Sequence, residues 1–402
     1  GGETTAEGNL FGGNNQTGIA VAAAIETIKI SNNKIGFNIN GIPIISNTAN
    51  GIYVNGQTAK PLIKNNTIAG QLKGIYIYFV NGGFKVEDNN IGTGSLASEN
   101  FGNNTGIHVH LCNNGIIGGD LISQTNRIAY NQTGVLLEIA YPISILKNSF
   151  YCNATAVTFE DLPTGKTITQ SRISDITANS VSGQYLPNAK VELFYTDECA
   201  DCQGKTWFAT LPTDAEGNWS YYAGTITGKV TSMGTNADGA TATFSKPLII
   251  NESAVITGVV CGETTGSIEV DVFDASHFEW YNSAGELVGE ERILTGVGFG
   301  TYYLKAGQNG TCDVISASFT ISSSNNGIND LDKVIKNSFV SVVNGTVCFI
   351  NYNQIKVTYT IKTFFCITNR INPIHHTWIG AKDQSCSIIF FLFCQIYRRQ
   401  IS

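Results

Sequence analysis

His108 and His110 form a His-x-His pair, whose side chains could take part in metal binding. Alternate residues of a β-strand point to one face, so the two imidazoles would share a side, and imidazole nitrogen is a common zinc ligand. A zinc site uses at least three protein ligands, and no third ligand accompanies the pair in sequence. The sequence therefore predicts no metal site and no cofactor.

Three tyrosines, Tyr53, Tyr76 and Tyr78, suit a different chemistry. A tyrosine ring offers an apolar face and a hydroxyl, and this combination suits contact with a sugar ring. With His108 and His110 they are the candidate glycan-binding residues. The alternative is structural, because tyrosine is also a good strand residue on a solvated sheet.

Carboxylates would carry the chemistry if the chain were a polysaccharide lyase or a glycoside hydrolase. Residues 1–172 contain ten scattered acids and two arginines, Arg127 and Arg172. The adjacent acidic pairs, Glu87-Asp88 and Glu160-Asp161, lie at turn-like positions. Glu138 and Asp88 are the candidate acid groups of this enzymatic alternative. Without a cluster of acids on neighbouring repeats, the sequence favours a protein with no catalytic residues.

All these residues lie in an internal repeat, in which glycine precedes an apolar residue, any residue and a second apolar residue. Successive units begin 33, 23, 32, 28 and 22 residues apart, and asparagine-containing units lie between them. The repeats are Gly18-Ile19-Ala20-Val21, Gly51-Ile52-Tyr53-Val54, Gly74-Ile75-Tyr76-Ile77, Gly106-Ile107-His108-Val109, Gly134-Val135-Leu136-Leu137 and a degenerate Ala156-Val157-Thr158-Phe159; the asparagine units include Asn32-Asn33-Lys34-Ile35, Asn65-Asn66-Thr67-Ile68 and Asp88-Asn89-Asn90-Ile91.

The shorter intervals fit one coil of three short strands, and the longer ones fit a coil plus a loop. Inward apolar residues would stack in columns between the coils above and below, and turn asparagines would form a hydrogen-bonded ladder. When the repeats are aligned on their glycines, two columns of outward-facing side chains are predicted. One holds Ala20, Tyr53, Tyr76, His108 and Leu136, and the next holds Ala22, Asn55, Tyr78, His110 and Glu138.

At this point the chain resembles the secreted bacterial proteins that are built from right-handed parallel β-helix repeats. The resemblance covers about residues 8–160 and implies a solenoid fold, but no particular activity, since the fold hosts lyases, hydrolases, adhesins and spacers. It is carried by Ile91-Gly92-Thr93-Gly94, Phe101-Gly102-Asn103-Asn104-Thr105-Gly106-Ile107, Ile116-Ile117-Gly118-Gly119 and Asn126-Arg127-Ile128-Ala129.

The composition agrees with an all-β protein. Of 402 residues, 43 are glycine and only 14% are charged, against about 25% in an average soluble domain. The net charge of −7 is uneven: residues 1–172 are neutral, residues 173–322 carry −12 and residues 323–402 carry +5. No segment combines basic residues with interleaved aromatics, so nucleic-acid binding is not expected. No apolar run reaches the roughly 18 residues of a membrane helix.

Beyond residue 170 the pattern changes to strands bounded by turns. The segment Asn188–Lys205, with Thr213-Asp214-Ala215-Glu216-Gly217-Asn218-Trp219 after it, resembles the immunoglobulin-like module that often follows such β-helices. Cys261-Gly262, Glu279-Trp280-Tyr281 and Gly300-Thr301-Tyr302-Tyr303-Leu304 resemble repeats in large adhesins of gliding bacteria. Both resemblances imply small β-sandwiches.

The last segment is irregular. Ser323-Ser324-Asn325-Asn326-Gly327 has the composition of a flexible linker. The segment from Phe339 to Val357 is similar to the start of a type IX secretion sorting domain, and that similarity ends near residue 360. The remainder lacks alternation and turn signals, which is typical of a shifted reading frame. The chain also starts inside a repeat at Gly1, so we expect a fragment whose export signal and earlier coils are missing.

Cysteines divide by segment. Cys199 and Cys202 form a CxxC, which is compatible with a redox motif, half a zinc site or a tight disulfide, and an exported protein favours the disulfide. Cys261 and Cys312 bracket the adhesin-like module and form a second candidate disulfide. The solenoid cysteines, Cys112 and Cys152, are expected to be buried, and those of the tail, Cys348, Cys366, Cys386 and Cys394, stay without interpretation.

Together these patterns predict a parallel β-helix over 1–170, an immunoglobulin-like sandwich over 171–250, an adhesin-like sandwich over 251–322 and a linker with a degenerate tail over 323–402. The expected function is a secreted or cell-surface protein, acting as adhesin or spacer, whose partner is an extracellular polysaccharide or cell-envelope glycan. A polysaccharide lyase or glycoside hydrolase is the alternative.

Overall fold

The computed structural model describes residues 1–2, 4–22, 27–44, 47–197, 199, 202–249, 254–259, 265–270, 272, 275–308, 311–322, 338–343 and 346–351. Apart from two 3-10 turns, Thr5–Glu7 and Ile122–Gln124, the regular structure of these residues is all β-strand. The all-β prediction is therefore confirmed. No helix among them is long and apolar enough to cross a membrane.

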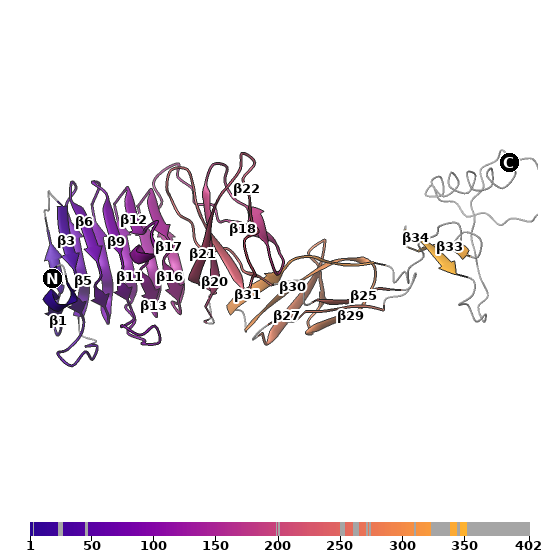
Figure 1. Cartoon of the computed structure of the whole chain (residues 1–402), viewed down its shortest axis with the longest axis horizontal. Helices are drawn as coiled ribbons and strands as arrows, with labels where there is room; N and C mark the ends of the chain where they lie inside the picture. The colour runs from indigo at the N-terminus through magenta and orange to yellow at the C-terminus, as the bar shows by residue number, and fades with distance from the viewer. Residues whose placement is uncertain are drawn as a thin grey trace, which may run out of the picture. The chain divides into compact units, whose positions relative to one another are not determined.

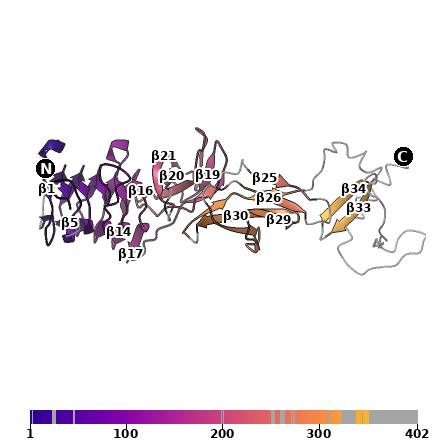
Figure 2. The same cartoon turned by 90° about the horizontal axis from the view of Figure 1, so that it is seen from below.

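Residues 10–160 form a parallel β-helix, as predicted (Figures 1 and 2). Five coils give one strand to each of three parallel sheets and the last coil gives a strand to two of them, so neighbouring strands in a sheet come from successive coils. The first sheet holds β2 (Ile19–Val21), β5 (Asn47–Asn55), β8 (Gln71–Tyr78), β11 (Thr105–His110), β14 (Thr133–Glu138) and β17 (Thr155–Glu160); the second holds β1 (Leu10–Phe11), β4 (Lys34–Ile35), β7 (Thr67–Ile68), β10 (Asn90–Ile91), β13 (Arg127–Ala129) and β16 (Ser149–Tyr151); the third holds β3 (Thr27–Ser31), β6 (Lys60–Lys64), β9 (Phe84–Glu87), β12 (Gly115–Gly118) and β15 (Ile143–Leu146).

Inward side chains stack in the expected columns. Ile52, Ile75, Ile107 and Val135 are register partners on consecutive coils, and each is fully buried. The glycine before each of them is required by close packing: a Cβ on Gly74 would lie 2.6 Å from the Gly106 carbonyl oxygen of the next coil. In the Gly–apolar–x–apolar repeat, the glycine thus marks a close backbone contact between coils and the apolar residues mark the buried columns.

Buried asparagines form a ladder along the stack, again as predicted. From Asn33 through Asn66, Asn89 and Asn126 to Asn148, each side-chain Nδ2 donates to the Oδ1 of the next asparagine at 2.8–3.0 Å. Each backbone N–H of the ladder donates to that same oxygen. The polar groups of these turns are therefore hydrogen-bonded without water, so burying the turns does not leave them unpaired.

Residues 172–249 form the next module, with a three-stranded antiparallel sheet facing four strands of a larger one. Its core contains Trp219, which is 3% exposed and follows the Asp214 turn as predicted. The small sheet has β18 (Arg172–Ile176), β19 (Val181–Gln184) and β22 (Asn218–Tyr221); the large sheet has β20 (Lys190–Thr196), β21 (Gly204–Pro212), β23 (Val230–Thr235) and β24 (Leu248–Ile249).

The following module packs around Trp280, which is fully buried. Its strand β31 pairs with β24 in parallel, so the larger sheet continues from one sandwich into the other. The strands are β25 (Val255–Thr257), β26 (Gly266–Glu269), β27 (His277–Asn282), β28 (Leu287–Gly289), β29 (Ile293–Val297), β30 (Gly300–Gln308), β31 (Thr311–Ser316) and β32 (Phe319–Ile321).

The last coil of the β-helix is covered by the first sandwich. A second ladder, Asn103–Asn131–Asn153, ends on Gln203, whose Oε1 accepts from Asn153 Nδ2 at 2.7 Å. Phe244 of the sandwich packs edge-on against Phe150 of β16, with ring centroids 5.6 Å apart. The sandwich thus supplies the hydrogen-bond partners and apolar cover that another coil would supply.

A disulfide joins the same two parts. Cys199 pairs with Cys152 of the last coil, with Cα atoms 5.0 Å apart. The expected Cys199–Cys202 pair is therefore wrong, because Cys152 approaches Cys199 only once the sandwich packs on the coil. Cys112 is free and buried. Cys261 lies outside the described residues, so its pairing with Cys312 stays a prediction.

A second unit, 327–402, contains the antiparallel hairpin of β33 (Ser338–Val343) and β34 (Thr346–Asn351). Residues 323–337 and everything after 351 lie outside the described residues, and with them the predicted linker and the irregular tail.

Candidate functional site

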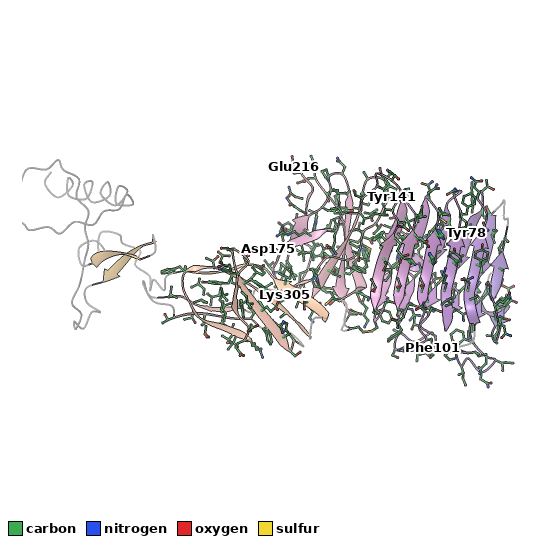
Figure 3. The ribbon with its side chains drawn as sticks, turned by 180° about the vertical axis from the view of Figure 1, so that it is seen from behind. Tyr78, Phe101, Tyr141, Asp175, Glu216 and Lys305 are labelled. Atoms are coloured by element: carbon green, nitrogen blue, oxygen red, sulfur yellow. A yellow bond between two sulfur atoms is a disulfide. The ribbon has the colours of Figure 1, made fainter. Side chains whose placement is uncertain are left out.

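The outward face of the first sheet brings the predicted site residues together. The register pairs Tyr53 with Tyr76, Tyr76 with His108, and Tyr78 with His110, so the two columns read from the sequence are real neighbours. Ring centroids are 5.4 Å apart for Tyr53–Tyr76 and 6.0 Å for Tyr76–Tyr78. Tyr78 is labelled among the outward side chains of the coils in Figure 3. These rings form one continuous aromatic surface, which we call the aromatic column: Tyr53, Tyr76, Tyr78, His108 and His110.

The aromatic column is less exposed than a plain solvated sheet would be. The three tyrosines are intermediate in exposure and His108 is only 4% exposed, because each ring covers its neighbour on the next coil. The His108 ring stacks on Tyr76 at 4.8 Å, and the Lys73 ammonium lies 3.9 Å above the Tyr76 ring centre. A ligand would therefore meet ring edges and hydroxyls that are already held in place.

The next coil adds a carboxylate to the two histidines. His108 Nε2 lies 2.9 Å from Glu138 Oε2, and His110 Nδ1 lies 3.5 Å from the same oxygen. The side-chain donor atoms of the three residues all lie within 4.8 Å of one another, a spacing that could hold a metal ion. The pair that lacked a third ligand in sequence thus has one in space. We call His108, His110 and Glu138 the His–His–Glu cluster.

Burial controls the protonation of this surface. Desolvation, followed by the charge of Lys73, lowers the pKa of His108 to about 4, even though the Glu138 carboxylate favours the charged ring. His108 is therefore neutral near pH 7 and donates to Glu138 as a neutral group. Burial also raises the pKa of Tyr76 to about 12, so its hydroxyl keeps its proton. That hydroxyl lies 3.2 Å from His110 Nδ1.

The acid groups of the enzymatic alternative lie apart. Glu138 belongs to the His–His–Glu cluster, whereas Asp88 lies at a turn on another part of the coil, with a φ of 56°, and burial raises its pKa. Its neighbour Glu87 is tied to Lys64 at 3.2 Å and to Gln124 at 2.8 Å. The second acidic pair contains Glu160, which is the register partner of Glu138 on β17.

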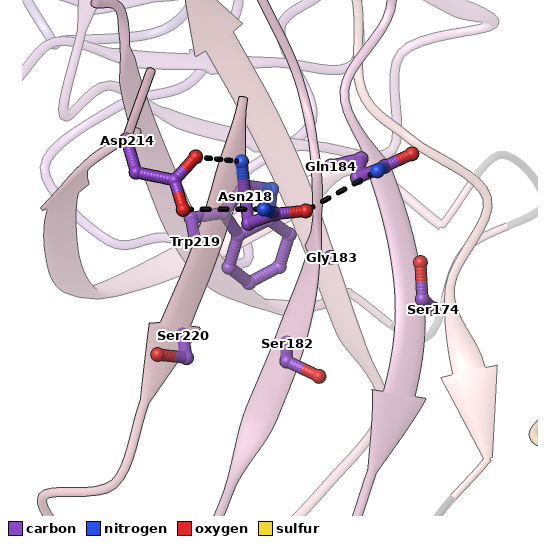
Figure 4. Close-up of a pocket in the computed structure, with 8 residues that line it drawn as sticks. All are labelled: Ser174, Ser182, Gly183, Gln184, Asp214, Asn218, Trp219 and Ser220. Carbon is purple, nitrogen blue, oxygen red and sulfur yellow. Dashed lines mark hydrogen bonds between the residues drawn. The ribbon is translucent and has the colours of Figure 1, made fainter. Parts of the chain in front are cut away.

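A separate pocket lies on the small sheet of the first sandwich (Figure 4). Asp214 accepts hydrogen bonds from the backbone and side chain of Asn218, and these bonds hold the turn before Trp219. The lining is therefore largely occupied by its own turn contacts. It consists of Ser174, Ser182, Gly183, Gln184, Asp214, Asn218, Trp219 and Ser220.

No family model and no curated protein matches the chain. Among solved structures it is similar to the BSP domain of a biofilm-associated protein, with 12% identity, a TM-score of 0.18 and coverage of 39% of this chain and 30% of that chain. It is also similar to extracellular domains 3–5 of Drosophila OTK, with 12% identity, a TM-score of 0.14 and coverage of 40% and 67%. Both TM-scores are too low to carry a function to this chain.

Proposed function

We propose that the protein is a non-catalytic binding protein of the cell surface or extracellular space, which contacts a polysaccharide or cell-envelope glycan along the aromatic column. The observation that carries this proposal is the aromatic surface formed by Tyr53, Tyr76 and Tyr78. Tyr53 and Tyr76 are register partners on neighbouring coils with ring centroids 5.4 Å apart, and Tyr78 lies beside Tyr76 on the same strand with a centroid distance of 6.0 Å. Consecutive parallel strands lie about 4.8 Å apart, so the rings repeat along the stack on a scale close to that of a sugar unit. An extended chain would then cross several coils.

The electrostatics of the face support a neutral or mildly charged partner. Residues 1–172 have equal numbers of acidic and basic side chains, so no strong field selects a polyanion. The disulfide between Cys152 and Cys199 is consistent with an exported protein, since such bonds persist in oxidising compartments. The two sandwiches would act as spacers in this arrangement.

A glycan array of bacterial exopolysaccharides and cell-envelope glycans tests the proposal. We expect retention by the wild-type chain and a loss of about a hundredfold in affinity for the Tyr53→Ala/Tyr76→Ala/Tyr78→Ala variant, because each of the three rings contributes about 1 kcal/mol. Tyr222→Ala, which removes a 73% exposed tyrosine of the first sandwich, serves as the control. Binding unchanged by the triple variant would exclude the aromatic column as the contact surface, and no binding by the wild type would leave only the spacer role.

The same polysaccharides test the lyase and hydrolase alternative. Release of reducing ends or of unsaturated uronates by the wild-type chain, lost in Glu138→Gln, would replace the proposed role with a catalytic one.

A further inference from the structure

We propose that His108, His110 and Glu138 bind a divalent transition-metal ion of the zinc class. This inference goes beyond glycan contact and does not depend on it, since the ligands come from the coils alone. It assigns a role to a buried histidine that a sugar could hardly reach.

The spacing of the donor atoms fits such an ion. Zinc binds imidazole nitrogen and carboxylate oxygen at about 2.0–2.2 Å, so two ligand atoms at a tetrahedral centre lie about 3.3 Å apart. In the structure the Glu138 oxygen lies 2.9 Å from His108 Nε2 and 3.5 Å from His110 Nδ1. Small rotations of the side chains are enough to admit the ion.

The scaffold holds these ligands on a rigid sheet. His108 and His110 alternate with the buried Val109 on β11, and Glu138 lies directly opposite His110 on β14. The two imidazole rings are nearly parallel, with an interplanar angle of 6°, and their centroids are 5.8 Å apart. Ligands fixed by strand register lose little conformational entropy when the ion binds.

Metal binding requires the other tautomer of His108. In the metal-free protein the ring proton lies on Nε2, which donates to Glu138 at 2.9 Å, while Nδ1 is buried and has no hydrogen-bond partner among the described residues. Moving that proton to Nδ1 frees the Nε2 lone pair for the metal. His110 offers Nδ1, which is hydrogen-bonded to the Tyr76 hydroxyl at 3.2 Å, so the metal would replace this contact.

The charges of the cluster favour nitrogen-binding metals. Glu138 supplies one negative charge, and Lys73 is the cation that faces it across Tyr76. Two imidazoles and a single carboxylate suit zinc, copper or nickel, whereas magnesium and calcium prefer several oxygen ligands. We therefore expect zinc-class binding without calcium binding.

The test uses the full chain with its disulfides intact, freed of metal by a chelator and titrated with Co²⁺ and then Zn²⁺. We expect one Co²⁺ to give the visible absorption of a low-coordinate nitrogen–oxygen site and Zn²⁺ to displace it. His110→Ala and Glu138→Gln should each weaken binding about tenfold or more. Both residues are partly exposed, so the variants should fold, and thermal unfolding without metal checks this.

Two controls match the variants closely. Glu160→Gln removes the neighbouring carboxylate of the same outward column on β17. His277→Ala removes a histidine that lies 3.2 Å from Glu279 and, within the part of the chain that the structure describes, has no second histidine beside it. Neither should change Co²⁺ affinity. Absence of Co²⁺ binding, a thiolate charge-transfer band, or affinity unchanged in His110→Ala and Glu138→Gln would overturn the proposal.

Discussion

Replacement of Asn126 by alanine tests the claim that the asparagine ladder holds the coils together. Asn126 is fully buried and is the fourth of the five asparagines in the ladder. Its Oδ1 accepts from the backbone N–H and the Nδ2 of Asn89, each at 2.9 Å, and its own Nδ2 donates to Val86 O at 2.7 Å and to Asn148 Oδ1 at 2.8 Å. The substitution thus removes four side-chain hydrogen bonds at once.

The expected cost follows from that count. Each lost bond contributes about 1 kcal/mol, and buried partners left without water cost more, so Asn126→Ala should lower the free energy of opening by about 4–6 kcal/mol. Asn126→Asp should be at least as harmful, because it keeps the acceptor but places a carboxylate oxygen against Val86 O and Asn148 Oδ1. Asn104→Ala, at an exposed turn position, should cost less than about 0.5 kcal/mol.

Native-state hydrogen exchange is the suitable assay. Tryptophan fluorescence is less direct, since Trp219 and Trp280 lie in the sandwich cores and Trp207 lies on β21, where it packs against the core of the coils. The protection of the Asn89 amide, which donates to Asn126, reads the ladder directly. A loss below about 1 kcal/mol in both Asn126 variants would show that the stacked apolar columns alone hold the coils and that the ladder is dispensable.

Three further results are expected. Burial raises the pKa of Glu192 to about 7, from an ordinary value of 4.5 that applies once the chain unfolds. The contribution of Glu192 to stability should therefore be fully present below about pH 4.5, fall by about 3 kcal/mol as pH rises to 7 and then level off, and Glu192→Gln should remove that component of the slope in denaturant titrations from pH 4 to 8. A slope unchanged by Glu192→Gln would refute the assignment. Cys152→Ser removes the Cys152–Cys199 disulfide, which closes a loop with a sequence separation of 47. In the chain-entropy model this should lower the free energy of unfolding by about 4 kcal/mol. The unfolding midpoint of the variant should be lower than that of the wild type, and reductant should not lower it further. Ile107→Ala should cost about 2–5 kcal/mol through the cavity that it leaves in a fully buried column, measured by the same exchange experiment, and a cost under 1 kcal/mol would mean that the column collapses around the gap.

Features that repeat along the chain could be predicted from sequence. The glycine before Ile75 or Ile107 marks both the backbone contact and the inward column, so the register of Tyr53, Tyr76 and His108 followed from simple alignment. The asparagine ladder followed in the same way. In each case the sequence pattern is periodic, because every coil packs on its neighbours in the same way.

Contacts that occur once were not predictable. Glu138 stood in the same column as His110 in the alignment, yet the approach of its carboxylate to both imidazoles depends on side-chain conformation. The pairing of Cys152 with Cys199 depends on how the sandwich packs on the last coil, and no local pattern encodes it. The low pKa of His108 likewise follows from burial by stacked neighbours rather than from its strand position.

The sandwich on the last coil also limits self-association. A stack of parallel strands ends in a row of unpaired amide and carbonyl groups, which is a template for end-to-end polymerisation with a second molecule. Here Glu192 and Asp197 accept from the Lys147 and Cys152 amides, at 2.8 and 2.7 Å, and Gln203 occupies the end of one ladder. At this end of the solenoid the next module caps the strand edge, so we expect it to prevent end-to-end growth into fibres.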